Sequence, residues 1–449
     1  MVAILIDIAY VLGLIVLSPV WLYRMLRYGR YRGGLGERFG KAPQRHGLQP
    51  VIWIHAVSLG EVNGIKSLVA ELSSQLPDYQ IVISSTTDTG MTQARKLFEP
   101  DRRVFLFPMD FSFVVRRAFH RLRPNLVVLM EGEAWPNFLR QANGMGIPVM
   151  IVNGRIGENK GYPRYKLVKP LVKRLLFSRL ASVGVQEQAY AERFIELGAD
   201  ASRVHVTGSL KFDTAVIMDK VEDAEALAAA VGLREGDKLI VAGGTGEGEE
   251  RPLLEMFGAM TRRKKFPPHT RLAIVPRKPE RFNEVARLIR QAGFVLVRRS
   301  ERKDGAASIA TPDAVILGDT MGELRKFYSL ASAVFVGRSL VPMGGSDMIE
   351  AAGLGKPVAF GPHVFNFPQA RILVDAGVAR QVPTAQELGE VLNGWLQDPA
   401  AAAAMGRRAQ DVIRNEQGAT QRNVELICDV LGRVPAERPG SIATVKLPQ

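Results

Sequence analysis

Three glutamates in the first half of the sequence follow predicted strands, where a carboxylate can exchange protons with a ligand. Glu61 follows an apolar strand predicted at 51–55 and opens the next helix, while Glu131 and Glu133 follow a strand predicted at 126–130. Because the carboxyl ends of parallel strands line ligand clefts, Glu61 is a candidate general base for a substrate hydroxyl. The structural alternative for Glu61 is a partner of the helix dipole. If only one of Glu131 and Glu133 faces the ligand, the other is solvated or a helix cap.

Hydroxyl and ammonium groups stand near further strand ends. Ser85 and Thr86 belong to a polar turn that suits a sugar or a carboxylate, although a capping turn explains them equally well. Ser58 is a candidate helix cap, and Gly60 permits close approach of a ligand. Lys211 either neutralises an anionic substrate or is a surface lysine.

The second half offers groups that suit a nucleotide. Arg277 follows a predicted strand, and its guanidinium can grip a phosphate with paired N–H groups. The segment 318–324 is a loop-to-helix junction with free N–H groups. The segment 335–367 is predicted to be a strand, a glycine-rich turn and a helix capped near Asp347, and Glu350 would then accept hydrogen bonds from a ribose. An ordinary βαβ unit with a solvated glutamate is the alternative.

Strands and helices alternate along the chain in two series, and the strands are continuous apolar runs. Such runs predict parallel sheets covered on both faces, so the predicted fold class is α/β with two Rossmann-like domains facing across a cleft. The expected division is an N-terminal membrane anchor, a first Rossmann-like domain, a linker, a second Rossmann-like domain, and a C-terminal helix with a polar tail, at residues 1–30, 31–212, 213–236, 237–415 and 416–449.

The chain of 449 residues carries a net charge of +14 and a single cysteine, so intramolecular disulfides are excluded. Basic residues gather at 24–45 and at 164–179, without the interleaved aromatic residues of a nucleic-acid platform. We therefore expect an anionic membrane surface as a partner and no nucleic acid.

The apolar segment 2–23 is followed, not preceded, by positive charge, unlike a cleavable signal. It predicts a membrane anchor, with the rest of the chain on the cytoplasmic side. Asp7 and Pro19 weaken a spanning helix, so a helix that lies on the membrane stays open as the alternative.

Taken together, these segments resemble the 3-deoxy-D-manno-octulosonic acid (Kdo) transferase family. The resemblance runs in order from the N-terminus to about residue 375, through the segments 38–40, 53–62, 84–90, 131–137, 208–213, 275–282, 318–324 and 335–367. It implies a GT-B glycosyltransferase that moves Kdo, with inversion, from CMP-Kdo to a lipid A precursor in lipopolysaccharide biosynthesis at the inner membrane. The first domain would then bind the acceptor and the second the nucleotide sugar. It implies no metal and no cofactor besides the donor substrate, which fits the absence of any Asp-x-Asp pair.

Carried over by position, the resemblance makes Glu61 the general base, with Glu131 and Lys211 supporting the transition state. It implies that CMP contacts Pro276, Arg277, Met321, Gly322, Glu323, Asp347, Met348, Ile349 and Glu350. The candidate acceptor or sugar contacts are Ser58, Gly60, Ser85, Thr86 and Glu133. The chain departs from the family at 344–347, where Gly-Gly-His-Asn is usual, and at 244–247, where Ser-Thr-His-Glu is usual.

Two other functions remain open on the sequence. A related GT-B transferase would use another nucleotide sugar, and a comparison of CMP-Kdo with UDP- and GDP-sugars separates it. A non-catalytic, membrane-tethered nucleotide-binding protein would bind CMP tightly and transfer nothing.

Overall fold

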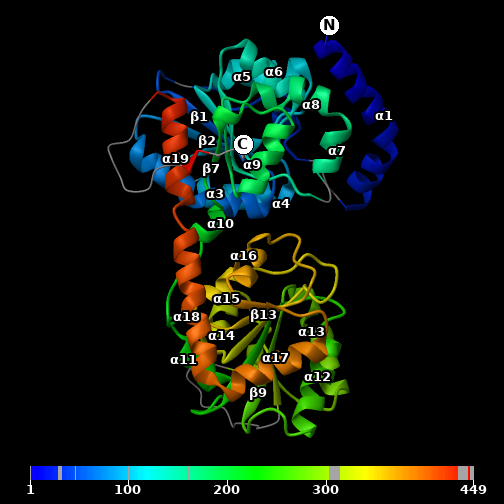
Figure 1. Cartoon of the computed structure of the whole chain (residues 1–449). Coiled ribbons are helices and arrows are strands. Elements are labelled where there is room, and N and C mark those ends of the chain that lie inside the picture. Colours follow the sequence, from blue (N-terminus) through cyan, green and yellow to red (C-terminus); the bar gives the residue numbers. More distant parts are fainter. Residues whose placement is uncertain are drawn as a thin grey trace. The chain divides into compact units, whose positions relative to one another are not determined.

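The computed structural model describes residues 2–28, 33–45, 47–99, 101–158, 161–302, 314–432 and 443–444. The chain forms two compact units (Figure 1): unit 1 comprises Met1–Thr214 and Glu416–Gln449, and unit 2 comprises Ala215–Asn415. Each unit is built on a largely parallel sheet, which confirms the predicted α/β class with two parallel-sheet domains. The predicted cleft between the domains stays a prediction.

Unit 1 has a sheet in the order β15-β7-β6-β5-β4-β1-β2-β3, in which the pairs are parallel except for that of β15. Its strands are β1 Val51–His55, β2 Gln80–Ser85, β3 Arg103–Leu106, β4 Leu126–Met130, β5 Val149–Gly154, β6 Ser182–Val185, β7 Val204–Val206 and β15 Ala443–Thr444. Its helices are α1 Val2–Tyr28, α2 Leu35–Arg38, α3 Leu59–Gln75, α4 Asp88–Phe98, α5 Ser112–Leu122, α6 Pro136–Gly144, α7 Tyr162–Leu167, α8 Lys169–Leu175, α9 Gln188–Glu196, α10 Leu210–Asp213 and α19 Ala419–Val430.

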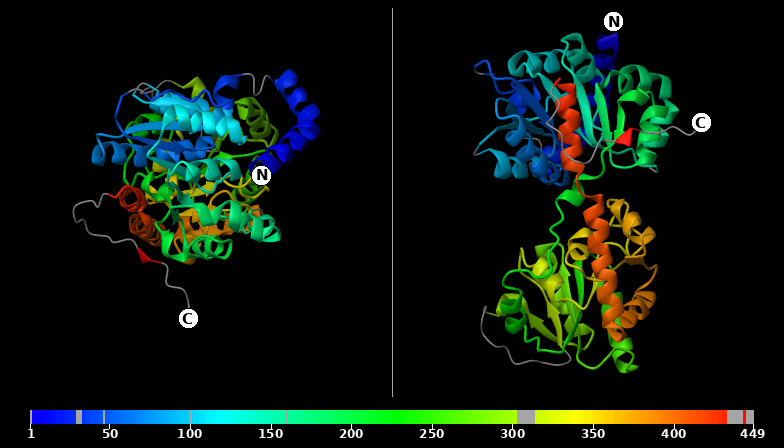
Figure 2. Two further views of the ribbon diagram at one scale, coloured as in Figure 1. Left: turned by 90° about the horizontal axis from the view of Figure 1, so that it is seen from above. Right: turned by 60° about the vertical axis from the view of Figure 1, so that its left-hand side comes forward.

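Both faces of this sheet are covered, as its continuous apolar strands require. Trp53 of β1 packs on one face among the rings of Phe105, Phe107, Phe119 and Phe138. The opposite face packs against α3 and α4, and also against α19, which reaches unit 1 from the far end of the chain. Figure 2 shows α19, in red, lying against the sheet of unit 1.

Unit 2 has a parallel sheet in the order β10-β11-β9-β8-β12-β13-β14. Its strands are β8 Lys238–Thr245, β9 Thr270–Pro276, β10 Val295–Arg298, β11 Ala314–Leu317, β12 Ala333–Val336, β13 Val358–Phe360 and β14 Ala379–Gln381. Its helices are α11 Ala224–Ala230, α12 Glu250–Arg262, α13 Phe282–Gln291, α14 Leu324–Leu330, α15 Ile349–Gly353, α16 Gln369–Asp375, α17 Ala385–Gln397 and α18 Pro399–Glu416.

The N-terminal helix α1 is tied to unit 1 by polar side chains. Asp7 accepts hydrogen bonds from the backbone N–H of Ser112, at 2.9 Å, and from Asn137 Nδ2, at 2.8 Å. The hydroxyl of Tyr10 donates to Asp110 at 2.8 Å. Within the described ranges, no helix is both long enough and apolar enough to cross a membrane. The predicted membrane-spanning form of the anchor is therefore not supported, and Asp7, which weakened it on the sequence, is used to dock the helix.

Candidate active site

The two sheets each reverse their strand order beside the first strand of the unit. In unit 1, β1 pairs with β2 on one side and with β4 on the other, so the loops after β1 and β4 flank the reversal. Ligands of open α/β sheets bind at such a switch point, outside the carboxyl ends of the strands. Glu61 follows β1, and Glu131 follows β4, so the fold brings these predicted residues to this point.

Glu61 lies in the first turn of α3 and pairs with the N-cap residue Ser58 as in a capping box, except that its carboxylate accepts the N–H of Val57 and not that of Ser58. Its Oε1 accepts the Ser58 hydroxyl at 2.8 Å, its Oε2 accepts the Val57 N–H at 2.9 Å, and its own N–H donates to Ser58 Oγ at 3.4 Å. Glu61 therefore does stabilise the start of the helix, which was the structural alternative to a catalytic role. Burial nevertheless raises the pKa of Glu61 to about 7, helped by the negative charges of Glu131 and Glu133.

Glu131 sits in the left-handed region, with φ 58°, which is uncommon for a residue with a side chain. Its backbone bonds to the end of β5, since its N–H donates to the carbonyl of Val152 and its carbonyl accepts the N–H of Arg155. Its carboxylate lies 3.7 Å from Arg155 Nε. Burial raises the pKa of Glu133, the second carboxylate of this loop. The predicted acidic residues of unit 1 therefore form one electrostatically coupled group.

The polar turn after β2 is tied to the loop that carries Glu61. Ser85 Oγ and Thr87 Oγ1 both donate to the carbonyl of Val57, at 3.0 and 2.9 Å. Thr86 Oγ1 lies 3.4 Å from Nε2 of His55. An added Cβ at Gly60 would meet only Ser58 Oγ, at 3.8 Å, so the surrounding protein itself does not demand glycine there.

His55 ends β1 beneath this loop and had no role in the sequence reasoning. It is fully buried, stacks on Phe107 with ring centroids 3.8 Å apart, and its Nδ1 lies 3.0 Å from Ser84 Oγ. Burial lowers its pKa to about 3, so the ring is neutral at physiological pH. A polar residue at the end of an otherwise apolar strand was the available signal.

Lys211 lies on the short helix α10 after β7. The hydroxyl of Ser209 accepts the Lys211 N–H at 3.4 Å, and the Asn153 side chain accepts the Leu210 N–H at 3.1 Å. Asn153 is the last residue but one of β5 and has φ 54°. The start of α10 is therefore fixed from the carboxyl end of another strand of the same sheet.

In unit 2 the loops after β8, β9 and β12 lie beside one another, because β8 pairs with both β9 and β12. Pro276 is the last residue of β9, and Arg277 follows it with its N–H bonded to the carbonyl of Thr245 at 3.0 Å. Arg277 is exposed at this edge of the sheet, which is the position that the sequence predicts for a phosphate contact.

The segment 321–323 leads into α14. Met321 is 71% exposed and Gly322 has φ 85°. The carboxylate of Glu323, in contrast, is occupied by the guanidinium of Arg299, with bonds of 3.0 and 2.9 Å. Glu323 therefore braces its own loop, and Arg299 is a residue of this site that the sequence gave no signal to find.

The segment 347–350 begins later as a helix than expected. α15 starts at Ile349 with Met348 as its N-cap, while Asp347 accepts the Ile349 N–H at 3.0 Å. Burial raises the pKa of Glu350 to about 7, helped by Asp347 and opposed by Arg325 and Arg277. Glu350, Asp347 and Arg277 are thus close enough to interact electrostatically, as a shared donor site requires.

The two departures from the family pattern lie against each other. Ser346 Oγ donates to the carbonyl of Gly244 at 2.9 Å. A Cβ added at Gly244 would lie only 2.7 Å from Ser346 Oγ. An added Cβ at Gly246 would lie 2.5 Å from Met343 Sδ. The smaller residues at 244 and 246 therefore fit the packing of the 343–346 turn in this chain.

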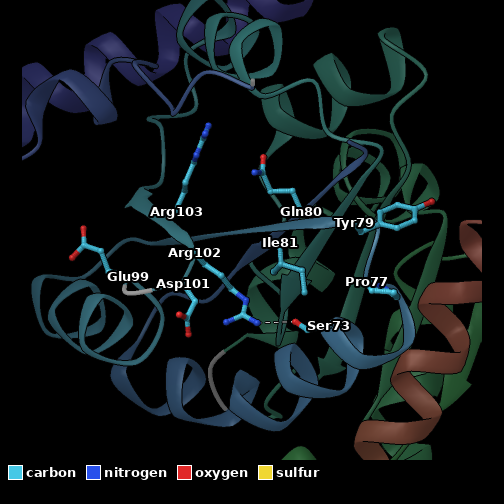
Figure 3. A pocket seen from close by; sticks show the side chains of 9 residues that line it. All are labelled: Ser73, Pro77, Tyr79, Gln80, Ile81, Glu99, Asp101, Arg102 and Arg103. Atoms are coloured by element: carbon cyan, nitrogen blue, oxygen red, sulfur yellow. Dashed lines mark hydrogen bonds between the residues drawn. The ribbon is translucent and has the colours of Figure 1, made fainter. Parts of the chain in front are cut away.

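A polar pocket of ≈ 480 Å³ lies elsewhere in unit 1 (Figure 3). Its lining includes Gln80, which begins β2, and Arg103, which begins β3. Arg102 Nη2 donates to Ser73 Oγ there at 2.8 Å. This pocket belongs to the amino ends of the strands, opposite the edge that carries Glu61, so we assign it no part in the site.

Each of the two α/β domains thus carries candidate residues at the switch point of its sheet, an acidic group in unit 1 and a group that includes Arg277 in unit 2. Solved structures similar in fold include a putative UDP-N-acetylglucosamine 2-epimerase from Listeria monocytogenes (TM-score 0.57, 14% identity, covering 85% of this chain and 96% of that one). MurG from Acinetobacter baumannii is another (TM-score 0.51, 16% identity, covering 85% and 100%). At such identities these likenesses show the fold alone, which is GT-B-like.

The chain belongs to the 3-deoxy-D-manno-octulosonic acid transferase family. The family model for 3-deoxy-D-manno-octulosonic-acid transferase (kdotransferase) matches residues 33–214. The transferase of that name from Bordetella pertussis is 34% identical over 438 residues, which cover 94% of this chain and 99% of that protein. The one from Haemophilus influenzae is 31% identical over 414 residues, covering 90% and 93%.

Proposed function

We propose that this glycosyltransferase moves Kdo, with inversion, from CMP-Kdo to a lipid A precursor in lipopolysaccharide core biosynthesis. The observation that carries the proposal is the environment of Glu61, a partly buried carboxylate at the switch point of unit 1 whose pKa is raised to about 7. A general base works best when its pKa lies near the working pH, which an ordinary glutamate does not reach. Relatives named as Kdo transferases support the sugar.

In the proposed reaction, the acceptor hydroxyl gives its proton to Glu61 as its oxygen attacks the anomeric carbon of Kdo. The bond from that carbon to the phosphate oxygen breaks, and CMP leaves with the electron pair. Arg277 holds the phosphate, and Glu350 accepts hydrogen bonds from the ribose. Lys211 and Glu131 stabilise the charge that develops on the sugar. These residues lie at the carboxyl edges of the two sheets.

The test is a product assay. Purified protein incubated with CMP-Kdo and a lipid A precursor is expected to yield, by mass spectrometry, acceptor that has gained Kdo, and a chelator is expected to leave turnover intact. UDP- and GDP-sugars serve as competing donors. Transfer from one of them and not from CMP-Kdo would contradict the donor, and tight CMP binding without any transfer would identify a non-catalytic nucleotide-binding protein.

We further propose that unit 1 works on the anionic cytoplasmic face of the inner membrane, where a lipid acceptor is found. The support is the pair α7 and α8, which exposes apolar side chains among basic ones. Leu167 is 86% exposed, Leu171 57% and Val168 43%. The exposed basic residues around them are Arg164, Lys166, Lys173 and Arg174. Apolar side chains within a basic ring are typical of helices that lie in a bilayer interface.

Replacing Leu167 and Leu171 together by Asp is expected to lower binding to phosphatidylglycerol vesicles by about tenfold or more, because it removes inserted apolar area and adds negative charge. Vesicle sedimentation measures the change. Val295→Asp, at a residue 53% exposed on the edge strand β10 of unit 2, is the control and should bind as the parent does. Equal vesicle binding by the double variant and the control would contradict this surface.

A further inference from the structure

Two adjacent glutamates, Glu249 and Glu250, are completely buried at the start of α12 in unit 2. Neither has a part in the reaction proposed above. A buried carboxylate is costly unless hydrogen bonds or a cation satisfy it, so their partners show what they do.

Glu249 binds four backbone N–H groups from two different loops. Its Oε2 accepts Gly246, at 2.9 Å, and Arg338, at 2.5 Å. Its Oε1 accepts Ser339, at 2.8 Å, and Leu340, at 2.9 Å. Gly246 belongs to the loop after β8, and the other three belong to the loop after β12. Hydrogen bonds to an ionised acceptor are the strong ones, so one carboxylate fastens these two loops together.

Glu250 fastens a third loop. Both of its oxygens bind the guanidinium of Arg281, at 2.6 and 3.2 Å, in a bidentate pair, and Arg281 also binds Glu284. Arg281 ends the loop after β9 that begins with Arg277. The two neighbouring side chains therefore reach the loops after β8, β9 and β12, which border the switch point of the unit 2 sheet.

These bonds continue into the candidate donor residues. The carbonyl of Arg338 accepts the Gly345 N–H at 2.7 Å, and Ser346 next along the chain binds Gly244 of the loop after β8. Arg338 is held at φ 60°, an uncommon backbone state for an arginine. The turn that leads to Asp347 and Glu350 is therefore fixed at its start by the Glu249 carboxylate.

We propose that Glu249 and Glu250 are positioning residues for the nucleotide donor: together they hold the three loops of unit 2 in the arrangement that binds it. The inference rests on the proposed donor only for the identity of the nucleotide. Glu249 and Glu250 act through Arg277 and through the 344–350 segment. They do not themselves contact the donor, because both carboxylates already accept hydrogen bonds from protein groups.

The decisive variant is Glu249→Gln. Its amide has one acceptor oxygen and turns two N–H donors toward backbone N–H groups, so about half of the four bonds are lost without a change in volume. We expect the dissociation constant for CMP, measured by calorimetry, and the KM for CMP-Kdo to rise about tenfold to a hundredfold. We expect kcat at saturating donor to change much less, because Glu61 is in the other unit. Glu255→Gln, at an exposed residue on the same helix, is the control.

Amide hydrogen exchange distinguishes this role from a general loss of stability. In Glu249→Gln, protection should fall selectively at Gly246 and at residues 338–340, whereas general destabilisation would raise exchange across the sheet of unit 2. If Glu249→Gln does not fold, Arg281→Lys provides the second variant. It weakens the bidentate pair and should raise the donor KM less, with exchange increased at 277–281.

The outcomes separate the two proposals. A parent protein that binds no CMP would contradict the proposed donor. A parent that binds CMP, with folded Glu249→Gln and Arg281→Lys variants of unchanged CMP affinity and donor KM, would overturn the positioning role and leave the proposed function standing.

Discussion

Replacing Glu61 by Gln is expected to lower the rate of Kdo transfer by about 10²- to 10⁴-fold, the usual contribution of a positioned general base. The substitution removes the proton acceptor and little else. The Gln amide oxygen can accept the Val57 N–H, and its amide N–H can donate to Ser58 Oγ in place of the bond that Ser58 now donates. The helix α3 should therefore still begin at the same residue. CMP affinity should be unchanged, because the candidate donor residues belong to unit 2.

The chain offers a matched control for this experiment. Thr384 and Glu387 pair at the N-cap of α17 through the same two bonds as Ser58 and Glu61, both at 3.2 Å, on an exposed surface. Glu387→Gln makes the same chemical change in the same local motif and should leave transfer unaltered. Steady-state kinetics and CMP calorimetry on both variants are the measurements. Near-parental turnover in Glu61→Gln would show that another group, or none, takes the proton.

Short apolar runs in the sequence predicted the strands that these runs form. The apolar runs at 51–55, 126–130 and 333–336 are β1, β4 and β12 with the expected bounds. The placement of Glu61 and Glu131 at strand ends followed from the strands, and the sheet order then made them neighbours. Parallel strands have a fixed direction, so residues that follow them must share one edge.

Side-chain partners far apart in the sequence could not be predicted in this way. Nothing near Glu323 indicates that Arg299 occupies its carboxylate, nor does the sequence around Glu249 show that it binds residues 338–340. The packing of α19 on α3 is a further example, since it joins the last described helix to the helix of Glu61. Each depends on the assembled tertiary structure, which a single sequence does not display.

The dependence of transfer on pH should show the unusual state of Glu61. Only the ionised carboxylate accepts a proton, so the rate should fall about tenfold per pH unit below its pKa. With the pKa at about 7, this acidic limb should begin near neutrality and not near pH 4.5, the ordinary value. Glu350 also has a pKa raised to about 7, so the profile is measured as kcat at saturating CMP-Kdo, where a change in donor affinity no longer contributes.

Glu131→Gln should then move that limb to lower pH. The negative charge of Glu131 raises the pKa of Glu61 more than that of Glu133 does, and its removal also leaves Arg155, 3.7 Å away, without its carboxylate partner. Both changes favour ionised Glu61.

Glu133→Gln removes an equal charge from the same loop and should shift the limb less. The position of the limb is the readout, because a lower plateau alone would also follow from a direct role of Glu131 in the transition state. Identical limbs in the parent and Glu131→Gln would mean that the titrating group lies outside this acidic cluster.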